Sequence, residues 1–180
     1  MAQKNISVKW CKKLIPLVRN HGKNPRIIKL KYQTDEKYLP EKPGIYIFAK
    51  QRCGASRKNY IIPLYIGCAQ NVRKRVMGYF NLSKSDKGKA SHKYKIMSEI
   101  GGRKDVSTAV LVVGRIEAPK ITKKTSIIVE KILIRKVVED LPKYELINTQ
   151  HKYTPQHCVE LQGNKVAGKL FGRKLFGNVK

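Results

Sequence analysis

A glutamate lies among apolar residues in the longest periodic segment of the chain, and a carboxylate in such a place could do chemistry. At about 100° per residue, Glu130 falls at the centre of an arc of five aliphatic side chains, namely Ile127, Leu133, Ile134, Val137 and Val138. An unpaired carboxylate is costly to bury. We therefore expect Glu130 either to pair with a buried arginine or to ligate a metal ion at the floor of a cleft.

Two tyrosines and an arginine lie where two strands and a helix are expected to meet. Tyr46 and Tyr65 belong to "GIYIFA" and "IIPLYIG", which predict two antiparallel strands whose shared face would bring the phenols together. Arg75 precedes Tyr79 by four residues, so the two side chains adjoin on one helix face. Gly67 allows a close backbone approach at the junction, where anions often bind. Half-buried strand aromatics and a solvated basic helix are the ordinary alternatives, but the combination with a misplaced carboxylate favours a phosphate site.

Three strands and three helices are predicted to position these residues. The strands are expected within residues 44–49, 61–67 and 106–114, with a hairpin loop over 50–59, and the helices within 69–80, 92–102 and 125–142. In the first helix the apolar arc consists of Ala69, Val72, Val76, Tyr79 and Phe80. Thr125 or Ser126 is expected to cap the long helix, and Pro142 to end it. A further short helix is expected within 8–18, stopped by Pro16, and residues 144–148 are expected to form a short strand or an extended tail.

The charge of the chain is the strongest global signal. With 39 Lys+Arg against 12 Asp+Glu the net charge is +27, an excess that repels itself unless a polyanion offsets it. Nucleic acid is the expected partner, and a membrane is not, because no long apolar run or amphipathic basic helix occurs. The four cysteines form no CxxC pair and no secretory signal is present, so we expect free thiols, no structural zinc, and an intracellular, cytoplasmic and DNA-associated protein.

One compact domain with basic extensions is the expected organisation. The domain is predicted over residues 41–150, after a basic arm at 1–40 and before a basic, glycine-containing extension at 151–180. The turn-rich "LPEKPG" marks the first boundary. "GKLFGRKLFGNVK" in the extension is an imperfect duplication, too short to be a repeat fold.

Two tripeptides and four later residues occur in a characteristic order. Gly44-Ile45-Tyr46 and Tyr65-Ile66-Gly67 are followed by Arg75, Tyr79, Glu130 and Asn148. This order resembles the GIY-YIG nuclease superfamily over roughly residues 43–149. The stretch "YIGCAQNVRKRVMGYF" is similar to the corresponding stretch of the bacterial excision-repair nuclease. The resemblance implies an α+β fold, in which a small three-stranded antiparallel or mixed sheet is flanked by helices.

The resemblance also implies the hydrolysis of phosphodiester bonds at one divalent cation, Mg²⁺ or Mn²⁺, per active site. Tyr65 would be the general base or pass the proton of water onward, Arg75 would hold the scissile phosphate, and Glu130 would ligate the metal. Tyr46 and Tyr79 would position water and phosphate. Three further residues would support the site, with the last tying the end of the domain to its core: Gly44, Gly67 and Asn148.

Basic residues around this set are expected to serve two purposes. A free tyrosine has a pKa of about 10, so we expect Arg75, Lys93 or Lys95, together with a metal-bound water, to favour the phenolate of the base. Eight side chains are expected to contact DNA: Arg52, Arg57, Lys58, Arg73, Lys74, His92, Lys93 and Lys95. For the last three, a solvated start of a basic helix is an equally open alternative. Cys68 stands where many members of the superfamily have a small polar or basic residue, and a structural thiol is expected there.

The resemblance leaves the type of nuclease open. A site-specific type II restriction endonuclease acting on double-stranded DNA is the main expectation, because the chain is compact; a homing or repair-type nuclease is the alternative. An enzyme that cuts both strands of a palindrome would act as a homodimer or bind twice, since one such site handles one strand. The alternative from another class is a basic nucleic-acid-binding protein that has the fold but lacks catalysis.

Overall fold

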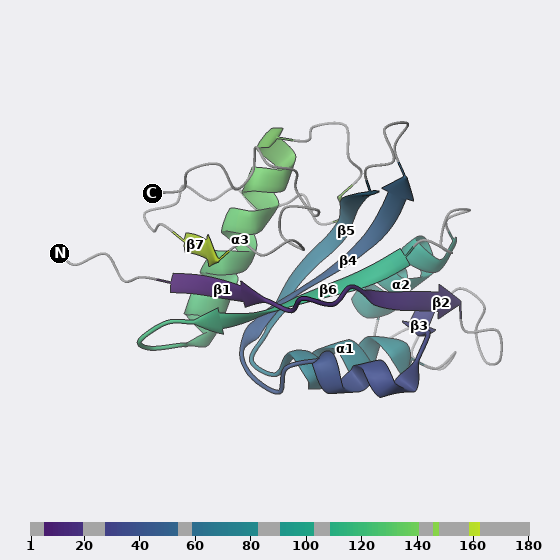
Figure 1. Ribbon diagram of the computed structural model, residues 1–180, viewed down its shortest axis with the longest axis horizontal. Helices are drawn as coiled ribbons and strands as arrows, with labels where there is room; N and C mark the ends of the chain where they lie inside the picture. Colours follow the sequence, from purple (N-terminus) through teal and green to yellow (C-terminus); the bar gives the residue numbers. More distant parts are fainter. Residues whose placement is uncertain are drawn as a thin grey trace.

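The computed structural model describes residues 6–19, 28–53, 59–82, 91–102, 109–140, 146–147 and 159–162. It is an α+β structure built on one sheet, as predicted (Figure 1). In chain order the elements are β1 (Ile6–Trp10), β2 (Ile15–Arg19), β3 (Ile28–Leu30), the 3-10 helix η1 (Gln33–Tyr38), β4 (Gly44–Cys53), β5 (Asn59–Ala69), α1 (Val72–Phe80), α2 (Ser91–Gly102), β6 (Ala109–Glu117), α3 (Lys123–Asp140) and β7 (Val159–Gln162). No helix in the described part of the chain is both long and apolar enough to cross a membrane.

The three predicted strands form the centre of the sheet, in the order β5-β4-β6. β4 pairs antiparallel with both neighbours, and Tyr46 lies opposite Gly67 on one side and Val113 on the other. The predicted hairpin is confirmed, but the strands run beyond the expected loop at 50–59, to Cys53 and from Asn59. β-branched and aromatic residues continue the strand pattern on either side of the turn, which explains the longer hairpin.

The prediction of a short helix within residues 8–18 is wrong, because β1 and β2 occupy this segment. Both pair antiparallel with the free edge of β6 and follow one another along it (Figure 1): Lys9 lies opposite Arg115, and Ile15 opposite Leu111. In β1 every second residue is buried, which is the period of a strand.

The sheet is consequently larger than the three strands that were predicted. β3 pairs with β2, and β7 pairs with β1 in parallel, so that seven strands take part. β1 and β2 lie within the predicted N-terminal arm, and β7 within the predicted C-terminal extension. Those two segments therefore contribute to the sheet rather than only flanking it.

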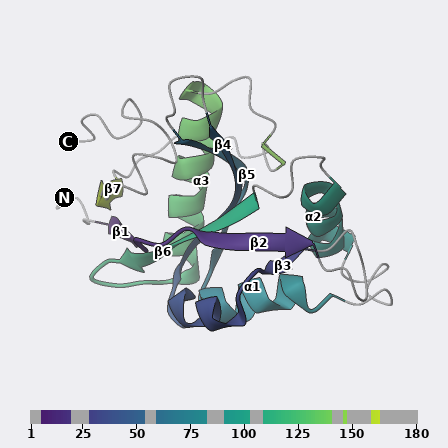
Figure 2. The same cartoon turned by 45° about the vertical axis from the view of Figure 1, so that its right-hand side comes forward.

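Helices cover both faces of the sheet (Figure 2). Alternate residues of β4 point to opposite faces: Ile45 and Ile47 pack with α3, whereas Tyr46 and Phe48 pack with α1 and α2. Two aliphatic and aromatic cores result, one on each side. The helices therefore approach the same strands from opposite directions.

The three predicted α-helices are present, with two corrected starts. α1 begins at Val72, not at Ala69, which is the last residue of β5. α1 buries Val72, Val76, Tyr79 and Phe80, as its periodicity predicted. α3 begins at Lys123, not after Thr125 or Ser126. Thr122 precedes it and accepts a hydrogen bond from the N–H of Thr125 at 3.1 Å, the geometry of a helix N-cap. Leu146 and Ile147 form no strand, but the Ile147 N–H donates to the Leu64 carbonyl at 2.8 Å, which fits the expected extended tail.

Candidate active site

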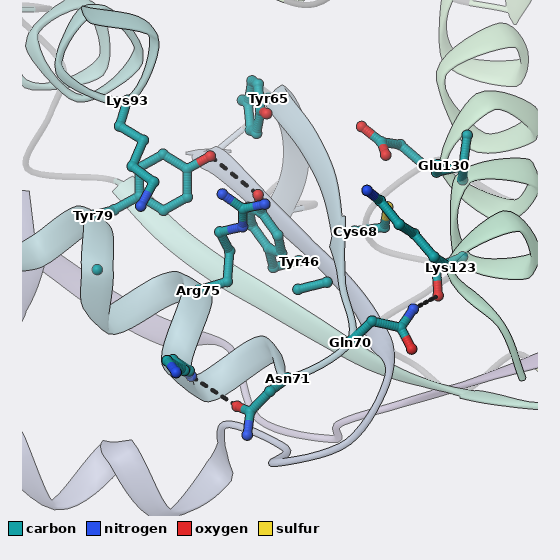
Figure 3. Close-up of a pocket in the computed structure, with 15 residues that line it drawn as sticks. Tyr46, Tyr65, Cys68, Gln70, Asn71, Arg75, Tyr79, Lys93, Lys123 and Glu130 are labelled. Atoms are coloured by element: carbon teal, nitrogen blue, oxygen red, sulfur yellow. Dashed lines mark hydrogen bonds between the residues drawn. The ribbon is translucent and has the colours of Figure 1, made fainter. Parts of the chain in front are cut away.

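One cavity of about 850 Å³ lies where the end of β5 meets α1 and the first half of α3 (Figure 3). All the residues that the sequence predicted to be catalytic line it: Tyr46, Tyr65, Arg75, Tyr79 and Glu130. They come from β4, β5, α1 and α3. The fold therefore assembles in one place a set of residues that are far apart in the chain.

The cavity spans the edge of the sheet. The tyrosines project from the face that α1 and α2 cover, whereas α3 packs on the other face. Among the described strands β5 pairs only with β4, so its outer side is not covered by another strand there. At this edge, side chains from both faces reach the same space, and Glu130 can meet groups that belong to the opposite core.

Three tyrosines form the inner wall of the cavity. The Tyr46 ring centroid lies 5.8 Å from that of Tyr79 and 6.2 Å from that of Tyr65, and the Tyr46 and Tyr79 hydroxyls are hydrogen-bonded at 3.1 Å. Phe48 completes the cluster, 5.5 Å from the Tyr79 ring. All three phenols are buried. The prediction that Tyr46 and Tyr65 share a sheet face is confirmed.

Gly67 is required by the position of the Tyr46 ring. Gly67 faces Tyr46 across the β4–β5 pair, and a Cβ at this residue would fall on the ring and hydroxyl of Tyr46. Gly44 is as constrained, because a Cβ there would meet the carbonyl oxygen of Gly114 and the side chain of Val72. Both glycines of the tripeptides thus have a steric role next to the cavity, as expected of supporting residues.

α1 places two basic side chains, Lys74 and Arg75, along the cavity. Asn71 caps the helix, since its side-chain oxygen accepts a hydrogen bond from the Lys74 N–H at 2.8 Å. With the helix fixed in this rotation, Tyr79 points into the core while Lys74 and Arg75 are exposed and line the cavity. Lys93 of α2 lies with its Nζ 5.7 Å from the Tyr79 ring centroid, a cation–π contact.

α3 lines the cavity with one stripe of residues at helical spacing: Lys123, Ser126, Ile127 and Glu130. The apolar face that packs on the sheet is centred on Val129, Leu133 and Val137. The prediction that Glu130 lies at the centre of the apolar arc is therefore wrong. It lies at the edge of that face, half-buried, and Val138 is 40% exposed. Glu130 lines the cavity, so its carboxylate lies at a cleft.

A hydrogen bond connects the end of β5 to α3. Gln70 Nε2 donates to Ser126 Oγ at 3.0 Å, and Ser126 is 1% exposed. Ser126 also donates to the Thr122 carbonyl, at 3.4 Å. These contacts hold the first turn of α3 beside the tyrosine wall.

Burial raises the pKa of two phenols of the cavity, those of Tyr46 and Tyr65. It raises the pKa of Tyr46 well above its ordinary value, and the neighbouring Tyr79 and Tyr65 add to the rise. The pKa of Tyr65 is raised by burial, by Tyr79 and by the negative charge of Glu130. Arg75 lowers the pKa of Tyr46, as expected of a neighbouring cation, but burial and the other tyrosines outweigh it. The effect of a metal-bound water on the phenol of the base stays a prediction.

Cys68 lines the cavity between Tyr65 and Glu130. Burial and the nearby Glu130 carboxylate raise the pKa of this thiol, although the charge of Arg75 opposes the rise. A protonated, partly buried thiol is a poor nucleophile. Cys68 thus agrees with the structural role expected of it.

The residues predicted to contact DNA fall into three groups. Lys74 and Lys93 line the cavity, while Lys95 is exposed outside it. Arg73 differs from the prediction, because its guanidinium is ion-paired with Glu36 at 2.8 Å and with Glu41, which connects α1 to the segment around η1. The structure describes only the backbone of Arg52 and His92, and Arg57 and Lys58 lie outside the described residues. Asn148, which was predicted to support the site and not to contact DNA, also lies outside them.

The residues present fit a hydrated divalent cation. Within the described ranges no group of three or more His, Cys, Asp and Glu side chains could enclose a metal, and Glu130 is the acidic residue that lines the cavity. Mg²⁺ is usually held by one or two carboxylates together with water and substrate phosphates, not by an all-protein cage. Glu130 facing a wide cavity matches this kind of site, and Mn²⁺ would suit the same oxygen ligand.

Several residues that line the cavity were not among the predicted site residues, and four of them carry amide, hydroxyl or ammonium groups: Gln70, Asn71, Lys123 and Ser126. The spacing from Glu130 could have indicated Lys123 and Ser126, which precede it by seven and four residues on the same helix face. Comparison of the chain with protein-family models, with curated proteins and with solved structures found no match. The function of the cavity is therefore inferred from its own geometry and chemistry.

Proposed function

We propose that the protein is a divalent-metal-dependent DNA endonuclease of the GIY-YIG type, which hydrolyses phosphodiester bonds in the cavity at the edge of β5. The observation that supports this most is the convergence of three tyrosines, an arginine and a glutamate from four elements on one open cavity. These five residues are also those of the resemblance. An arrangement of this kind combines a cation for the phosphate, an oxygen ligand for a metal and hydroxyls for water.

In the proposed reaction water adds to phosphorus and the bond from phosphorus to one ester oxygen breaks. The products are a phosphate monoester and a hydroxyl end, and one proton of the water ends on the leaving oxygen. Glu130 would hold a divalent cation through its carboxylate, and the bound cation would supply the positive charge that polarises the phosphate and acidifies water. Arg75 binds the scissile phosphate and offsets the charge that develops on it, which is usually the largest single catalytic contribution.

The protonated phenols act in this scheme by hydrogen bonding. A neutral tyrosine donates one hydrogen bond and accepts another, so Tyr65 can orient water and relay a proton without being a phenolate beforehand. Tyr79 holds the Tyr46 hydroxyl at 3.1 Å, and this pair fixes the back of the cavity. The raised pKa values favour the proton-relay role of Tyr65 over that of a free-standing base.

Double-stranded DNA is the proposed substrate because of the net charge of +27 and the basic rim of the cavity. Incubation of the purified protein with plasmid DNA and Mg²⁺ or Mn²⁺ tests the proposal, with EDTA as the matched control. Cleavage that depends on the metal is the expected result. Discrete fragments would support a site-specific restriction enzyme, and a smear would favour a non-specific or repair-type nuclease.

A shifted but intact plasmid in every metal would contradict the nuclease proposal. That result would favour the alternative of a basic binding protein without catalysis. Single-strand nicks that precede double-strand breaks would indicate that one cavity handles one strand at a time. A rate that rises with the square of the protein concentration would indicate a homodimer on a palindromic site.

A further inference from the structure

Cations surround the cavity on both of its walls. Lys74, Arg75 and Lys93 belong to the wall formed by α1 and α2, and Lys123 belongs to the wall formed by α3. Glu130 is the carboxylate among these lining residues. If Arg75 holds the scissile phosphate, the cation on the opposite wall has no role in the scheme above.

Lys123 extends from the first turn of α3 into the cavity, toward the space that Arg75 and Glu130 also face (Figure 3). None of the ion pairs formed among the described residues involves Lys123. Arg73 offers the contrast, because two carboxylates hold it outside the cavity. Lys123 is therefore a cation that lines the cavity and forms no ion pair with a carboxylate of the described residues.

The position of Lys123 in its helix is electrostatically unfavourable unless an anion lies nearby. The first turn of α3 contains Lys123 and Lys124 and no acidic residue. Cations near a helix N-terminus oppose the helix dipole. A phosphate at this end of the cavity would attract both the lysine side chain and the positive end of the helix dipole.

The first turn of α3 is also fixed in position. Thr122 caps the helix, and the hydrogen bond from Gln70 to the buried Ser126 ties the same turn to the end of β5. A lysine on an anchored turn can serve as a defined contact and not only as diffuse charge. The cavity volume of about 850 Å³ is near the upper end of the range of about 300–1,000 Å³ that takes a whole small-molecule ligand, so more than one phosphate group has room.

We propose that Lys123 forms a second phosphate-binding subsite in this cavity, which takes the DNA backbone phosphate adjacent to the one at Arg75. The inference rests on the proposed nuclease function. The two phosphates would lie against opposite walls, so the strand would cross the cavity from α1 to α3. Lys123 would then set which bond of the strand reaches Arg75 and Glu130.

The test measures the affinity of a fluorescently labelled DNA duplex over a series of NaCl concentrations, in EDTA so that no cleavage occurs. Loss of one phosphate contact makes the slope of log affinity against log salt shallower by about 1. Lys123→Ala is expected to show this change and Lys123→Arg to keep the wild-type slope. Lys124→Ala is the matched control, because Lys124 is the next residue of the same turn but lies outside the cavity.

Cleavage kinetics provide the second readout. Lys123→Ala is expected to raise KM for the duplex about tenfold with kcat changed much less, since a flanking phosphate is bound equally in the ground and transition states. A slope equal to that of the wild type, or an equal change in Lys124→Ala, would overturn the subsite. A loss confined to kcat would do so as well.

The outcomes for the two proposals can be told apart. Wild-type protein that binds the duplex but cuts no DNA in any divalent metal overturns the nuclease function, while the slopes measured in EDTA still decide whether Lys123 binds a phosphate. Wild-type protein that fails to bind duplex DNA overturns both.

Discussion

The proton on Tyr65 determines what this residue can contribute at neutral pH. The Tyr65 ring contacts the rings of Tyr46 and Tyr79. The negative charge of Glu130 raises the pKa of Tyr65. A phenol in these surroundings stays neutral at pH 7 and can form hydrogen bonds. The three phenols of the cavity therefore resemble one another in burial, and the charges that distinguish the site come from Arg75 and Glu130.

Single substitutions at those two charges test the proposed chemistry most directly. Arg75→Ala and Glu130→Gln are each expected to lower the rate of plasmid cleavage by about 10²- to 10³-fold or more, because each removes charge that acts on the transition state. Duplex binding in EDTA is expected to stay within a few-fold for Glu130→Gln. Initial rates at saturating Mg²⁺ provide the measurement.

Arg73→Ala is the matched control for Arg75→Ala. Arg73 is an arginine of the same helix, but its guanidinium is paired with Glu36 and Glu41 and does not line the cavity. Its loss is expected to affect stability slightly and turnover little. Equal losses of turnover in the two arginine variants would count against a specific role for Arg75.

At the scale of elements, the periodic segments with one clear buried face could be predicted from the sequence. β4, β5, β6 and the three α-helices all overlap predicted segments, because strand and helix periods differ strongly there. β1 and β2 were missed since lysines at 12 and 13 and Pro16 obscure a period that covers only five residues in each strand. The edge of β6 that these strands cover is a tertiary feature, and no local pattern reveals it.

The candidate site was predictable to a similar extent. The residues proposed to be catalytic followed from the tripeptides, from the arginine and tyrosine of the helix after them, and from one carboxylate in an apolar helix. Lys123 and Ser126 were missed because a lysine or serine at a helix start is ordinary, although their spacing from Glu130 places them on the same helix face. The protonation of Tyr65 could not be predicted, since it depends on burial and not on residue type.

The inclusion of β1 in the sheet leads to a stability prediction. Trp10 is 3% exposed in the core beneath α3, so Trp10→Ala is expected to lower the free energy of unfolding by about 3–5 kcal/mol. Tyr32→Ala is the control, an aromatic of the same N-terminal region that is 51% exposed, with an expected effect of about 0.5 kcal/mol or less. Urea unfolding measures both. Equally small effects would mean that residues 1–40 are only an appended arm.

For the whole molecule, the charge of +27 has opposite effects on folding and on binding. Raising the ionic strength from about 0.01 M to about 0.15 M shortens the Debye length from about 30 Å to about 8 Å. The self-repulsion of the folded protein weakens, so Tm is expected to rise, whereas duplex affinity is expected to fall with a log–log slope of about −0.9 per phosphate contact.

Thermal unfolding and duplex titration over the same salt series check this pair of trends. Choline chloride at matched ionic strength distinguishes screening from specific effects of Na⁺. A Tm that falls as salt is added would show that surface ion pairs, such as those of Arg73, outweigh the general repulsion.

The position of the cavity at the sheet edge has a mechanical consequence. Arg75 and Glu130 stand on helices that rest against opposite faces of β4 and β5, so the sheet lies between their supports. The distance between the two charges therefore depends on how far α3 lies from the strands. Side chains that pack between α3 and the sheet, such as Val129 and Leu133, set this spacing. If the reaction needs both charges at one phosphate, the aliphatic core residues under α3 influence it through this distance, without contacting the substrate.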